Sequence, residues 1–285
     1  METSSLARRL STRFVAGETL EEALAVARKL NSEGITVTLD HLGESVSTLA
    51  EAAEARDVYL RTLDAIHGNA IQGNVSLKLT QFGLDLSEEQ CLANVDRLVQ
   101  HAAELDSFVR VDMESSDYTD RTLDLVHTLH ARHGAVGVVI QSYLYRSQAD
   151  VERLCAGKIR VRLCKGAYLE PADVAFPRKG DVDRSYLELT RYLLQHGVYP
   201  AIATHDEAVI RQICRFVAEG QIPLDSFEFQ MLYGIRRDVQ RRLVAGGYRV
   251  RLYVPFGKAW YPYYMRRLAE RPANVFFMLR NLFRR

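Results

Sequence analysis

Two adjacent arginines, Arg266 and Arg267, could bind a small anion together. They lie in the stretch YYMRRLAERPAN, Tyr263 to Asn274, which follows the strand-like run RVRLYVPFG and has the pattern of a helix. Neighbouring helical side chains point about 100 degrees apart, so both guanidinium groups reach one ligand only near the end of the helix. The pair is therefore interpreted either as a clamp for an anion or as a solvated basic face.

A second candidate for chemistry is Lys165, in the segment RLCKGAYLEP at 162–171. Gly166 and Ala167 leave the main chain uncovered, and Lys165 can reach a phosphate or a ring carbonyl. A lysine in this position could instead form a Schiff base, as aldolase-type chemistry requires. The long loop that follows, at 170–185, is interpreted either as a lid or as an exposed insertion.

Eight strand-like runs alternate with helical stretches and would position these residues. The strands are expected at 36–40, 74–79, 108–114, 136–141, 159–165, 200–206, 227–232 and 248–254. The helices are expected at 45–66, 87–104, 118–132, 147–156, 182–196, 207–219, 236–245 and 259–270. In a chain of 285 residues this pattern predicts an α/β fold, a (β/α)8 barrel of the TIM type.

A short helical lead-in precedes the barrel. Thr19 and Glu22 have the spacing of a capping box before an apolar pattern of helical period, and Gly34 marks its end. No linker or low-complexity segment divides the chain, so we expect a single domain over 1–285. Its parts are the lead-in at 1–34, the barrel at 35–270 and a C-terminal helix at 271–285.

The strands alternate polar with apolar residues. Every second position gives a polar set: Thr36, Thr38, Asp40, Ser76, Lys78, Arg110, Asp112, Glu114, Arg160, Arg162, Glu228, Gln230, Arg249, Arg251 and Tyr253. Because the helices cover the outer face of a barrel, this polar set must face the lumen. Six basic and four acidic groups would then lie inside. Buried charges are costly unless paired, so we expect a matched network with a basic surplus suited to anionic ligands at the mouth.

Polar residues also gather where the strands end, which is where barrel enzymes have their active sites. They are Asp40, His41, Lys78, Asp112, Gln141, residues 162–168, Thr204, His205, residues 230–232 and Tyr253. So many polar side chains directed at one mouth favour a catalytic site over a bare scaffold.

Composition argues against several other functions. The net charge of +1 gives no reason to expect nucleic-acid binding. No apolar run reaches the roughly 20 residues of a membrane span, and the polar N-terminal sequence lacks the apolar core of a secretory signal. Four scattered cysteines suit a reducing compartment, so we expect a cytoplasmic protein.

Neither a metal site nor a dinucleotide fold of the Rossmann type is expected. His127, His130 and His133 recur on an expected outer helix, away from the mouth of the barrel, and they are interpreted as a solvated face. No Gly-rich dinucleotide fingerprint follows any of the expected strands.

The C-terminal segment NVFFMLRNLFRR combines aromatic and apolar residues with three arginines. A basic amphipathic helix of this kind can dock on an anionic membrane, cap the barrel or join a partner subunit. If the segment joins a partner subunit, the protein would be a homo-oligomer.

The motifs TLDHLGE, SLKLTQFG, VRVDME, RLCKGAY, ATHD, FEFQMLYG and YVPFG…YYMRRLAERPAN together resemble those of the flavin-dependent proline dehydrogenases. The resemblance extends in order from about residue 35 to residue 277. The sequence is similar to the monofunctional form of these enzymes and to the proline dehydrogenase domain of bifunctional proline-utilisation proteins. It implies an FAD-bearing barrel that oxidises L-proline to Δ1-pyrroline-5-carboxylate, the first step of proline catabolism, and passes electrons to a membrane quinone.

The resemblance also implies roles for individual residues. Substrate would be bound by Lys78, Leu232, Tyr253, Tyr264, Arg266 and Arg267, the paired arginines clamping the proline carboxylate. Flavin would be bound by Met113, Gln141, Arg162, Lys165, Gly166, Ala167, Thr204 and His205. The catalytic residues would be Asp112, which orients a cationic side chain, and Arg162, which stabilises negative charge on the flavin as hydride arrives. The proline amine must be unprotonated, so activity should rise with pH.

Two alternatives from other functional classes remain. A lyase or aldolase would use Lys165 as a Schiff base on a keto acid, and borohydride would trap it without any flavin. A barrel that only binds a carboxylate or phosphate, as a sensor or storage protein, would show binding without turnover. The resemblance favours proline oxidation, and the basic tail adds the expectation of peripheral contact with the inner face of the membrane.

Overall fold

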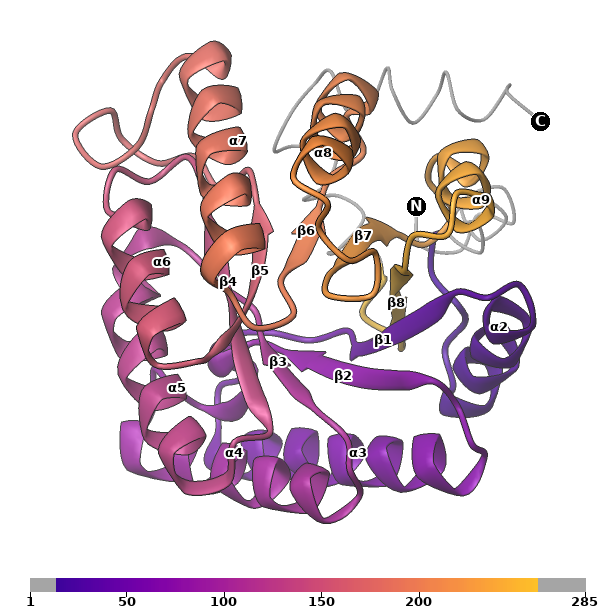
Figure 1. Ribbon diagram of the computed structural model, residues 1–285. Coiled ribbons are helices and arrows are strands. Elements are labelled where there is room, and N and C mark those ends of the chain that lie inside the picture. Colours follow the sequence, from indigo (N-terminus) through magenta and orange to yellow (C-terminus); the bar gives the residue numbers. More distant parts are fainter. Residues whose placement is uncertain (1–13, 261–285) are drawn as a thin grey trace, which may run out of the picture.

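The computed structural model describes residues 14–260, which form a closed barrel of eight parallel strands surrounded by helices (Figure 1). The strands follow one another around the barrel in chain order, and β8 closes it by pairing with β1. Their bounds are β1 Thr36–His41, β2 Gly73–Leu77, β3 Val109–Val111, β4 Val136–Gln141, β5 Arg160–Cys164, β6 Ala201–Ala203, β7 Glu228–Leu232 and β8 Val250–Phe256. The predicted (β/α)8 barrel is confirmed.

A helix follows each strand from β1 to β7. The bounds are α3 Leu49–Gly68, α4 Glu88–Glu104, α5 Thr119–His133, α6 Ser147–Ala156, α7 Lys179–His196, α8 Glu207–Glu219 and α9 Arg237–Ala245, with short 3-10 helices η1 Leu79–Phe82 and η2 Ser116–Tyr118 before α4 and α5. The helices α6 and α8 have the predicted bounds, and α3 differs most, since it begins at Leu49 rather than at 45. Among residues 14–260, no helix is both long and apolar enough to cross a membrane.

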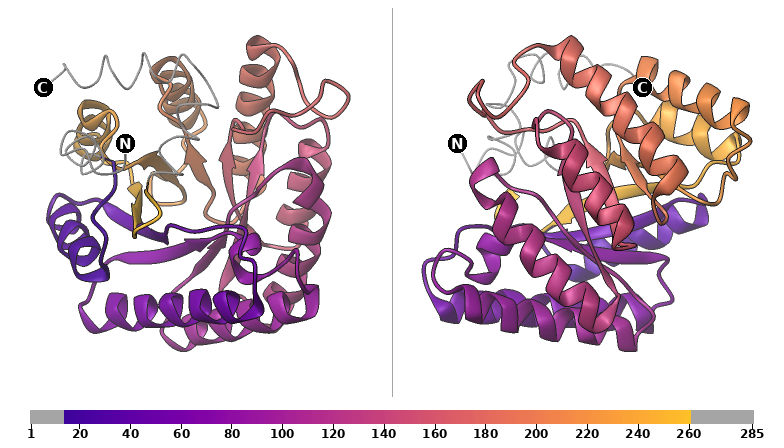
Figure 2. Two further views of the ribbon diagram at one scale, coloured as in Figure 1. Left: turned by 180° about the vertical axis from the view of Figure 1, so that it is seen from behind. Right: turned by 60° about the vertical axis from the view of Figure 1, so that its left-hand side comes forward.

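Both views in Figure 2 show the helices on the outer side of the strands. Most of the helix predicted at 259–270, and all of the C-terminal helix predicted at 271–285, lie outside the described residues. The assignment of the whole chain to one domain therefore stays a prediction.

The lead-in helix α2, Leu20–Ser32, begins at the predicted capping box. The main-chain N–H of Glu22 donates to the Thr19 hydroxyl at 3.3 Å, and the Glu22 carboxylate accepts from the Thr19 N–H at 3.0 Å. These bonds satisfy two N–H groups that the first turn leaves without helical partners. The buried face of α2 joins the apolar core that surrounds the barrel.

The outward face of the strands is apolar and fully covered by the helices. Val37, Leu39, Val75 and Leu77 are each 0% exposed and belong to one continuous core with the inner faces of the helices. Burial of this layer from water is the main free-energy gain of the fold. The same alternation leaves the polar residues no place but the lumen, as predicted.

The lumen contains most of the predicted polar set. Thr38, Asp40, Ser76, Arg110, Arg162, Glu228 and Gln230 are all buried. The prediction is wrong for Arg160 and Arg249, which are exposed. They lie where β5 and β8 begin, at the N-terminal rim of the barrel, so solvent reaches them, and the Arg160 guanidinium stacks at 5.1 Å on the ring of Phe108.

Among residues 14–260, the predicted charge network is present as three ion pairs inside the barrel. Glu228 pairs with Arg251 at 2.8 Å, Asp112 with Arg162 at 3.2 Å, and Asp40 with Lys78 at 4.0 Å. Each pair joins residues from different strands or strand ends, so the network also fixes the interior side chains relative to one another.

Arg110, another basic residue of the interior, is bonded to main-chain carbonyls, whereas the three cations above pair with carboxylates. Its guanidinium donates to the main-chain carbonyls of Val138, at 3.2 Å, and Arg160, at 2.7 Å. The basic surplus expected at the mouth therefore does not include Arg110, whose Nη1 is engaged by carbonyls lower in the barrel and whose buried Nε has no acceptor among residues 14–260.

The segment between β5 and α7 extends as a long loop beyond the strands (Figure 2). Residues of this loop pack on the loop after β4, where Ala175 bridges to Leu144 and Phe176 N–H donates to the Tyr143 carbonyl at 2.8 Å. The first part of the loop behaves differently, because Gly166, Ala167 and Tyr168 border a cavity. The loop is thus partly a wall of that cavity and partly a packed insertion.

Candidate active site

A cavity of about 570 Å³ lies at the C-terminal ends of the strands. Its lining comprises Lys78, Asp112, Met113, Val139, Gln141, Arg162, Cys164, Lys165, Gly166, Ala167, Tyr168, Lys179, Ala203, Thr204, His205, Asp206, Gln230, Met231, Leu232, Ile235 and Tyr253. The volume falls within the range of about 300–1,000 Å³ that is usual for small-molecule and cofactor sites. Of the described residues, four with cationic and two with anionic side chains line it, so this part of the wall carries the basic surplus predicted from the sequence.

The structure brings together the predicted residues that it describes. All eight residues predicted to bind flavin line the cavity, namely Met113, Gln141, Arg162, Lys165, Gly166, Ala167, Thr204 and His205. Of the residues predicted to bind substrate or to act in catalysis, Lys78, Asp112, Leu232 and Tyr253 line it as well. Tyr264, Arg266 and Arg267 lie outside the described residues, so their predicted roles stay predictions.

Strand ends place these side chains at one mouth. Asp112 directly follows β3, and its N–H donates to the carbonyl of Leu77 at 2.8 Å, which extends the strand pairing by one step. Lys78 directly follows β2 and Thr204 directly follows β6. Because parallel strands all end on the same side of a barrel, residues far apart in the chain meet there.

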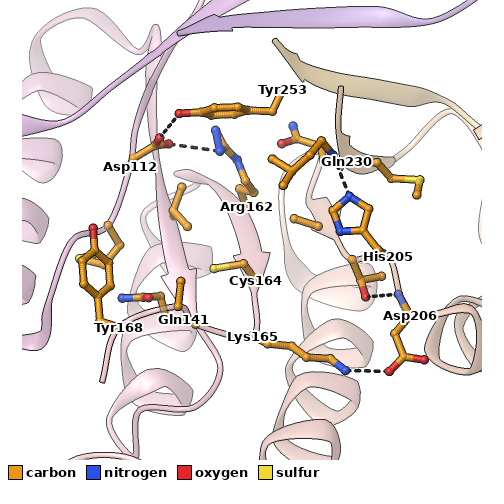
Figure 3. Close-up of a pocket in the computed structure, with 18 of the residues that line it drawn as sticks. Asp112, Gln141, Arg162, Cys164, Lys165, Tyr168, His205, Asp206, Gln230 and Tyr253 are labelled. Carbon is orange, nitrogen blue, oxygen red and sulfur yellow. Dashed lines mark hydrogen bonds and ion pairs between the residues drawn. The ribbon is translucent and has the colours of Figure 1, made fainter. Parts of the chain in front are cut away.

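Asp112 lies at the centre of a hydrogen-bonded cluster (Figure 3). Its Oδ1 accepts from the Ser76 hydroxyl at 2.5 Å and faces the Arg162 guanidinium at 3.2 Å. Its Oδ2 accepts from the Tyr253 hydroxyl at 2.8 Å. Both carboxylate oxygens are therefore engaged by donors from β2, β5 and β8.

The environment of Asp112 favours its ionised form. Burial raises the pKa of this carboxyl, but the charges of Arg162 and Lys78 act in the opposite direction. Hydrogen bonds from Ser76 and Tyr253 add to the lowering, and the resulting pKa lies below its ordinary value. An ionised carboxylate with all its oxygens occupied orients its neighbours, and it is poorly placed to abstract a proton.

Arg162 presents one face to an aromatic ring and its two ends to oxygen atoms. Its Nη2 donates to the Ser76 hydroxyl at 2.8 Å, and its guanidinium lies 5.3 Å from the ring centre of Tyr253 (Figure 3). The Nε atom is buried and has no hydrogen-bond acceptor among residues 14–260. A buried donor of this kind costs free energy unless a ligand supplies the acceptor.

Lys78 is oriented by an interior carboxylate. Its Nζ lies 4.0 Å from Oδ2 of Asp40, whose other oxygen is 3.1 Å from the Tyr59 hydroxyl. Asp40 is 0% exposed and Lys78 is 8% exposed, so the pair is largely removed from solvent. Coulombic attraction between such groups is screened less than on the surface.

Lys165 is held by two carboxylates at the edge of the cavity. Its Nζ donates to Asp183 on α7 at 2.6 Å and to Asp206 at 3.0 Å. Figure 3 shows the contact with Asp206. Lys179 pairs with the same Asp183. Asp206 also caps α8, since its Oδ1 accepts from the N–H groups of Ala208 and Val209. The position of Lys165 is thus tied to the beginning of two helices.

His205 is fixed in one tautomer by the main chain. Its Nε2 accepts a hydrogen bond of 2.9 Å from the N–H of Leu232, so in the neutral ring the proton resides on Nδ1. This bond joins the residues after β6 to the end of β7. It also keeps the side chain of Leu232 at the cavity wall.

A buried carboxyl supports the cavity from behind. The Glu114 side chain accepts from the N–H of Thr80 at 3.1 Å and from its hydroxyl at 2.8 Å. The main-chain carbonyl of Glu114 accepts from Nε2 of Gln141 at 2.8 Å. Burial raises the pKa of Glu114, and the Thr80 hydrogen bonds offset this only in part.

Gly166 is required by the shape of the loop that borders the cavity. Its φ of +113° lies in the region that favours glycine, and a Cβ atom there would overlap the ring of Tyr143. The sequence prediction that small residues expose the main chain here is consistent with this geometry.

The family of the chain follows from comparison with known proteins. A family model described as "Proline dehydrogenase" matches residues 23–280. The chain belongs to the proline dehydrogenase family. It is 44% identical over 278 residues to the proline dehydrogenase of Deinococcus radiodurans, covering 96% of this chain and 90% of that protein. It is 42% identical over 273 residues to proline dehydrogenase 1 of Bacillus subtilis strain 168, with the same coverage.

Longer proteins share the same barrel. The bifunctional protein PutA of Escherichia coli K12 is 30% identical over 320 residues, which cover 96% of this chain and 24% of PutA. The crystal structure of PutA from Bdellovibrio bacteriovorus inactivated by N-propargylglycine is similar with a TM-score of 0.86 and 27% sequence identity. That match covers 92% of this chain and 32% of the PutA chain. The described chain therefore has the fold of one part of the bifunctional proteins.

Membership of the proline dehydrogenase family makes the chain an oxidoreductase of proline catabolism. It decides against the binding-only barrel considered above. The match covers 90% of the length of each of the two proline dehydrogenases named above. Among residues 14–260 no three His, Cys, Asp or Glu side chains are grouped so as to hold a metal ion.

The structure adds residues to this proline dehydrogenase site that the sequence did not single out. Those lining the cavity are Val139, Lys179, Ala203, Asp206 and Ile235. Asp206 could have been predicted as a helix N-cap, because it directly precedes a strongly helical pattern. Lys179 was missed because α7 begins three residues earlier than 182, the predicted start.

Proposed function

We propose that the chain oxidises L-proline to Δ1-pyrroline-5-carboxylate with FAD as cofactor and a membrane quinone as electron acceptor. The observation that carries the proposal is the Asp112–Arg162–Tyr253 cluster in the wall of a cationic cavity. Family membership supplies the reaction class. The cluster supplies what this reaction needs from the protein, which is a fixed cation beside the reacting atoms.

The residues of the cavity fit FAD. The buried Nε of Arg162 has no acceptor among the described residues, and a ring nitrogen or carbonyl oxygen of a flavin could supply one. The cationic surplus suits the pyrophosphate, with Lys165 at the edge of the cavity near the beginning of α8. The proposed FAD contacts are Met113, Gln141, Arg162, Lys165, Gly166, Ala167, Thr204 and His205.

When bound, FAD supplies the acceptor for the hydride that leaves C5 of proline. Arg162 stabilises the negative charge that develops beside it, and its fixed position means that little reorganisation is needed during the reaction. Asp112 and Tyr253 hold the guanidinium between a carboxylate and an aromatic face. Arg162 and Asp112 are therefore the proposed catalytic residues.

The substrate is bound by cations and by apolar walls. Arg266 and Arg267 are proposed to clamp the proline carboxylate with bidentate hydrogen bonds, and Lys78 adds a third positive charge. Tyr253, Leu232 and Tyr264 are proposed to cover the pyrrolidine ring. Such a clamp fixes the reacting carbon relative to the hydride acceptor.

The amine of proline must lose its proton before hydride leaves. Asp112 is ionised and engaged by donors on both oxygens, so the proposal gives it an orienting role and leaves deprotonation of the amine to solvent. The rate should then rise with pH until the bound amine is unprotonated. A flat profile between mildly acidic and alkaline pH would contradict this part of the proposal.

The geometry disfavours the Schiff-base alternative. A lysine that attacks a carbonyl needs a lone pair directed at the substrate. The Nζ of Lys165 instead donates to Asp183 and Asp206 at 2.6 and 3.0 Å, so its protons are directed at carboxylates. Borohydride with a keto acid should leave the protein unmodified.

The acceptor and the place of action are further parts of the proposal. We infer a cytoplasmic enzyme that contacts the inner face of the membrane through its basic C-terminal segment, where quinone is available. Deletion of 276–285 should weaken binding to anionic liposomes and spare activity with a soluble dye. Loss of dye activity would indicate that the segment caps the barrel or joins a partner subunit.

The first test is the visible spectrum of the purified protein, followed by anaerobic addition of L-proline. Flavin bands that bleach with proline would support cofactor, substrate and reaction class together. Flavin bands that do not change on addition of proline would support FAD as cofactor and indicate that the substrate is another imino or amino acid. A colourless protein that FAD does not reconstitute would overturn the proposal.

A further inference from the structure

Ser76 is a fully buried hydroxyl that the mechanism above does not use. It lies on β2, where its Cα is opposite Arg110 of β3, and it is 0% exposed. Its side chain points into the lumen, directly behind the cluster formed by Asp112 and Arg162. It does not line the cavity, so it would act through other residues.

The Ser76 hydroxyl connects the two proposed catalytic residues. Its Oγ lies 2.5 Å from Oδ1 of Asp112 and accepts from Nη2 of Arg162 at 2.8 Å. Nη1 of the same guanidinium is 3.2 Å from that carboxylate oxygen. The three groups thus form a closed ring of hydrogen bonds, in which both ends of Arg162 have a defined acceptor.

The single hydroxyl proton has one preferred acceptor. Oγ is near two oxygens, Oδ1 of Asp112 at 2.5 Å and the carbonyl of Arg110 at 3.2 Å. A hydroxyl donates only once, and the shorter bond to a charged acceptor is the stronger one. Donation to Asp112 leaves the lone pairs of Oγ available to accept from Arg162. Through these two hydrogen bonds, the serine fixes the orientation of the guanidinium relative to the carboxylate.

The main chain of Ser76 is itself held rigidly. Its carbonyl oxygen is 2.8 Å from the Tyr59 hydroxyl, and Tyr59 is 0% exposed. Strand pairing on both sides of β2 fixes the remaining main-chain groups. The hydroxyl can rotate, but the oxygen atom is held at one place between the two catalytic side chains.

We infer that Ser76 is a positioning residue that holds Arg162 in the plane needed for charge stabilisation, through its simultaneous hydrogen bonds to Arg162 and Asp112. The inference rests on the proposed function of those two residues. Without the hydroxyl, Nη2 of Arg162 loses its acceptor, and Nε has none among the described residues. The contact with Asp112 and the Tyr253 ring would then remain to orient the guanidinium.

The test compares Ser76→Ala with the wild-type holoenzyme. In anaerobic mixing with saturating L-proline, the rate of flavin reduction should fall about tenfold, as expected when a buried cation loses its orientation. The proline concentration for half-maximal rate should change much less. The midpoint potential of the bound flavin should become more negative, because negative charge on the reduced cofactor is stabilised less.

Two further variants separate positioning from packing. Ser76→Thr retains the hydroxyl, and it should restore most of the rate and the potential. Thr38→Val removes another buried lumen hydroxyl, which bonds to Asn74 at 2.6 Å and does not contact Asp112 or Arg162. It should leave both quantities unchanged. The melting temperature of each variant is measured in parallel.

Each outcome decides the inference. A Ser76→Ala protein with wild-type rate and potential overturns it, and so does a slower variant with unchanged potential that threonine does not rescue. If the alanine variant does not fold, Ser76→Cys replaces it, since the thiol has nearly the same shape and is a weaker hydrogen-bonding group. A wild-type rate and potential in that variant would equally overturn the inference. If proline fails to reduce the wild-type flavin, the proposed function has failed instead, and the potential still reports on Ser76.

Discussion

The Tyr253 hydroxyl on β8 donates a hydrogen bond of 2.8 Å to Oδ2 of Asp112, which follows β3, three strands away around the barrel. The ring of the same tyrosine lies 5.3 Å from the guanidinium of Arg162. One side chain thus contacts both proposed catalytic residues, with its polar end on the carboxylate and its aromatic face on the cation. The position of the ring and the orientation of Asp112 are coupled.

Replacement of Tyr253 by phenylalanine tests this coupling. The ring remains against Arg162, and Asp112 loses one donor, a change of about 1 kcal/mol for a neutral hydrogen bond and more for a charged acceptor. We expect KM for proline to rise roughly three- to tenfold. We expect kcat to fall less, because Arg162 keeps its aromatic contact. Steady-state kinetics with a soluble dye measures both constants.

Tyr248→Phe is the matched control, because its hydroxyl lies beside Cys214 in the outer layer and away from the cavity. It should leave both constants near those of the wild type. Equal kinetics for Tyr253→Phe and wild type would show that the hydroxyl contributes nothing to substrate binding.

The contacts of Lys165 allow a prediction about the affinity for the proposed cofactor FAD. Lys165→Met removes the ammonium and leaves Asp183 and Asp206 with the largely exposed Lys179, which pairs with Asp183 and lies 3.9 Å from Asp206. Because the exposed Lys179 compensates their charge only in part, the two carboxylates would then repel an anionic cofactor. We expect the affinity for FAD to fall about tenfold, which corresponds to about 1.4 kcal/mol. Titration of the apoprotein with FAD, followed by flavin fluorescence, measures the change.

Adding Asp206→Asn to Lys165→Met should recover part of the lost affinity. The asparagine retains the cap of α8 through its side-chain oxygen and removes one of the two negative charges. Lys179→Met is the comparison, since Lys179 contacts the same two carboxylates through a side chain that is 68% exposed, so its loss should weaken FAD binding less. A double variant no better than Lys165→Met alone would rule out charge repulsion as the cause.

Much of this arrangement could be predicted from strand periodicity. Apolar residues such as Val37 and Val75 must face the helices, so their polar neighbours must face the lumen, and the ends of parallel strands must meet at one mouth. Asp112 and Arg162 were found in this way. The same rule failed for Arg160 and Arg249, because periodicity gives the side of a strand and does not show how far along the barrel axis a residue lies.

Partners that come from other elements could not be predicted. The bond between Ser76 and Asp112 depends on the register of β2 and β3, which the sequence of either strand leaves open. Lys165 meets Asp183 and Asp206 because the beginnings of α7 and α8 lie near the end of β5, a relation set by helix packing. Local sequence patterns carry no information on such distances.

The Glu228–Arg251 pair predicts a large effect on stability. Glu228 is 2% exposed, and its carboxylate is 2.8 Å from Nε of Arg251 inside the barrel. Glu228→Ala would leave that cation without its carboxylate partner, which typically costs about 3–5 kcal/mol. Urea unfolding followed by circular dichroism should show this loss in the free energy of unfolding.

The exposed pair Asp120–Arg146 provides the comparison. Asp120 is 76% exposed and lies 2.6 Å from Arg146, which also pairs with Asp150. Asp120→Ala should cost about 1 kcal/mol or less, because water screens surface pairs. Similar losses for the two variants would contradict the view that burial determines the strength of the interior pair.

The buried carboxyl of Glu114 should make the free energy of unfolding of the barrel depend on pH. Burial raises the pKa of this carboxyl above its ordinary value of 4.5, so the folded protein binds its proton more tightly than the unfolded chain does. The stabilisation is fully present below the ordinary value and is lost as the pH rises through the folded pKa. The free energy of unfolding should therefore contain a component that declines with increasing pH in this window.

Glu114→Gln should remove that component. Glutamine can still accept from the N–H of Thr80, but it does not ionise, so the variant should gain stability relative to the wild type as the pH rises from 4.5 through the folded pKa of Glu114. Urea unfolding of both proteins at a series of pH values from about 4 to about 8 measures the difference. Glu89→Gln, which removes an exposed carboxylate of α4, controls for the loss of one negative charge. A difference between Glu114→Gln and wild type that does not change with pH would contradict the prediction, because Glu114 would then not titrate in this range.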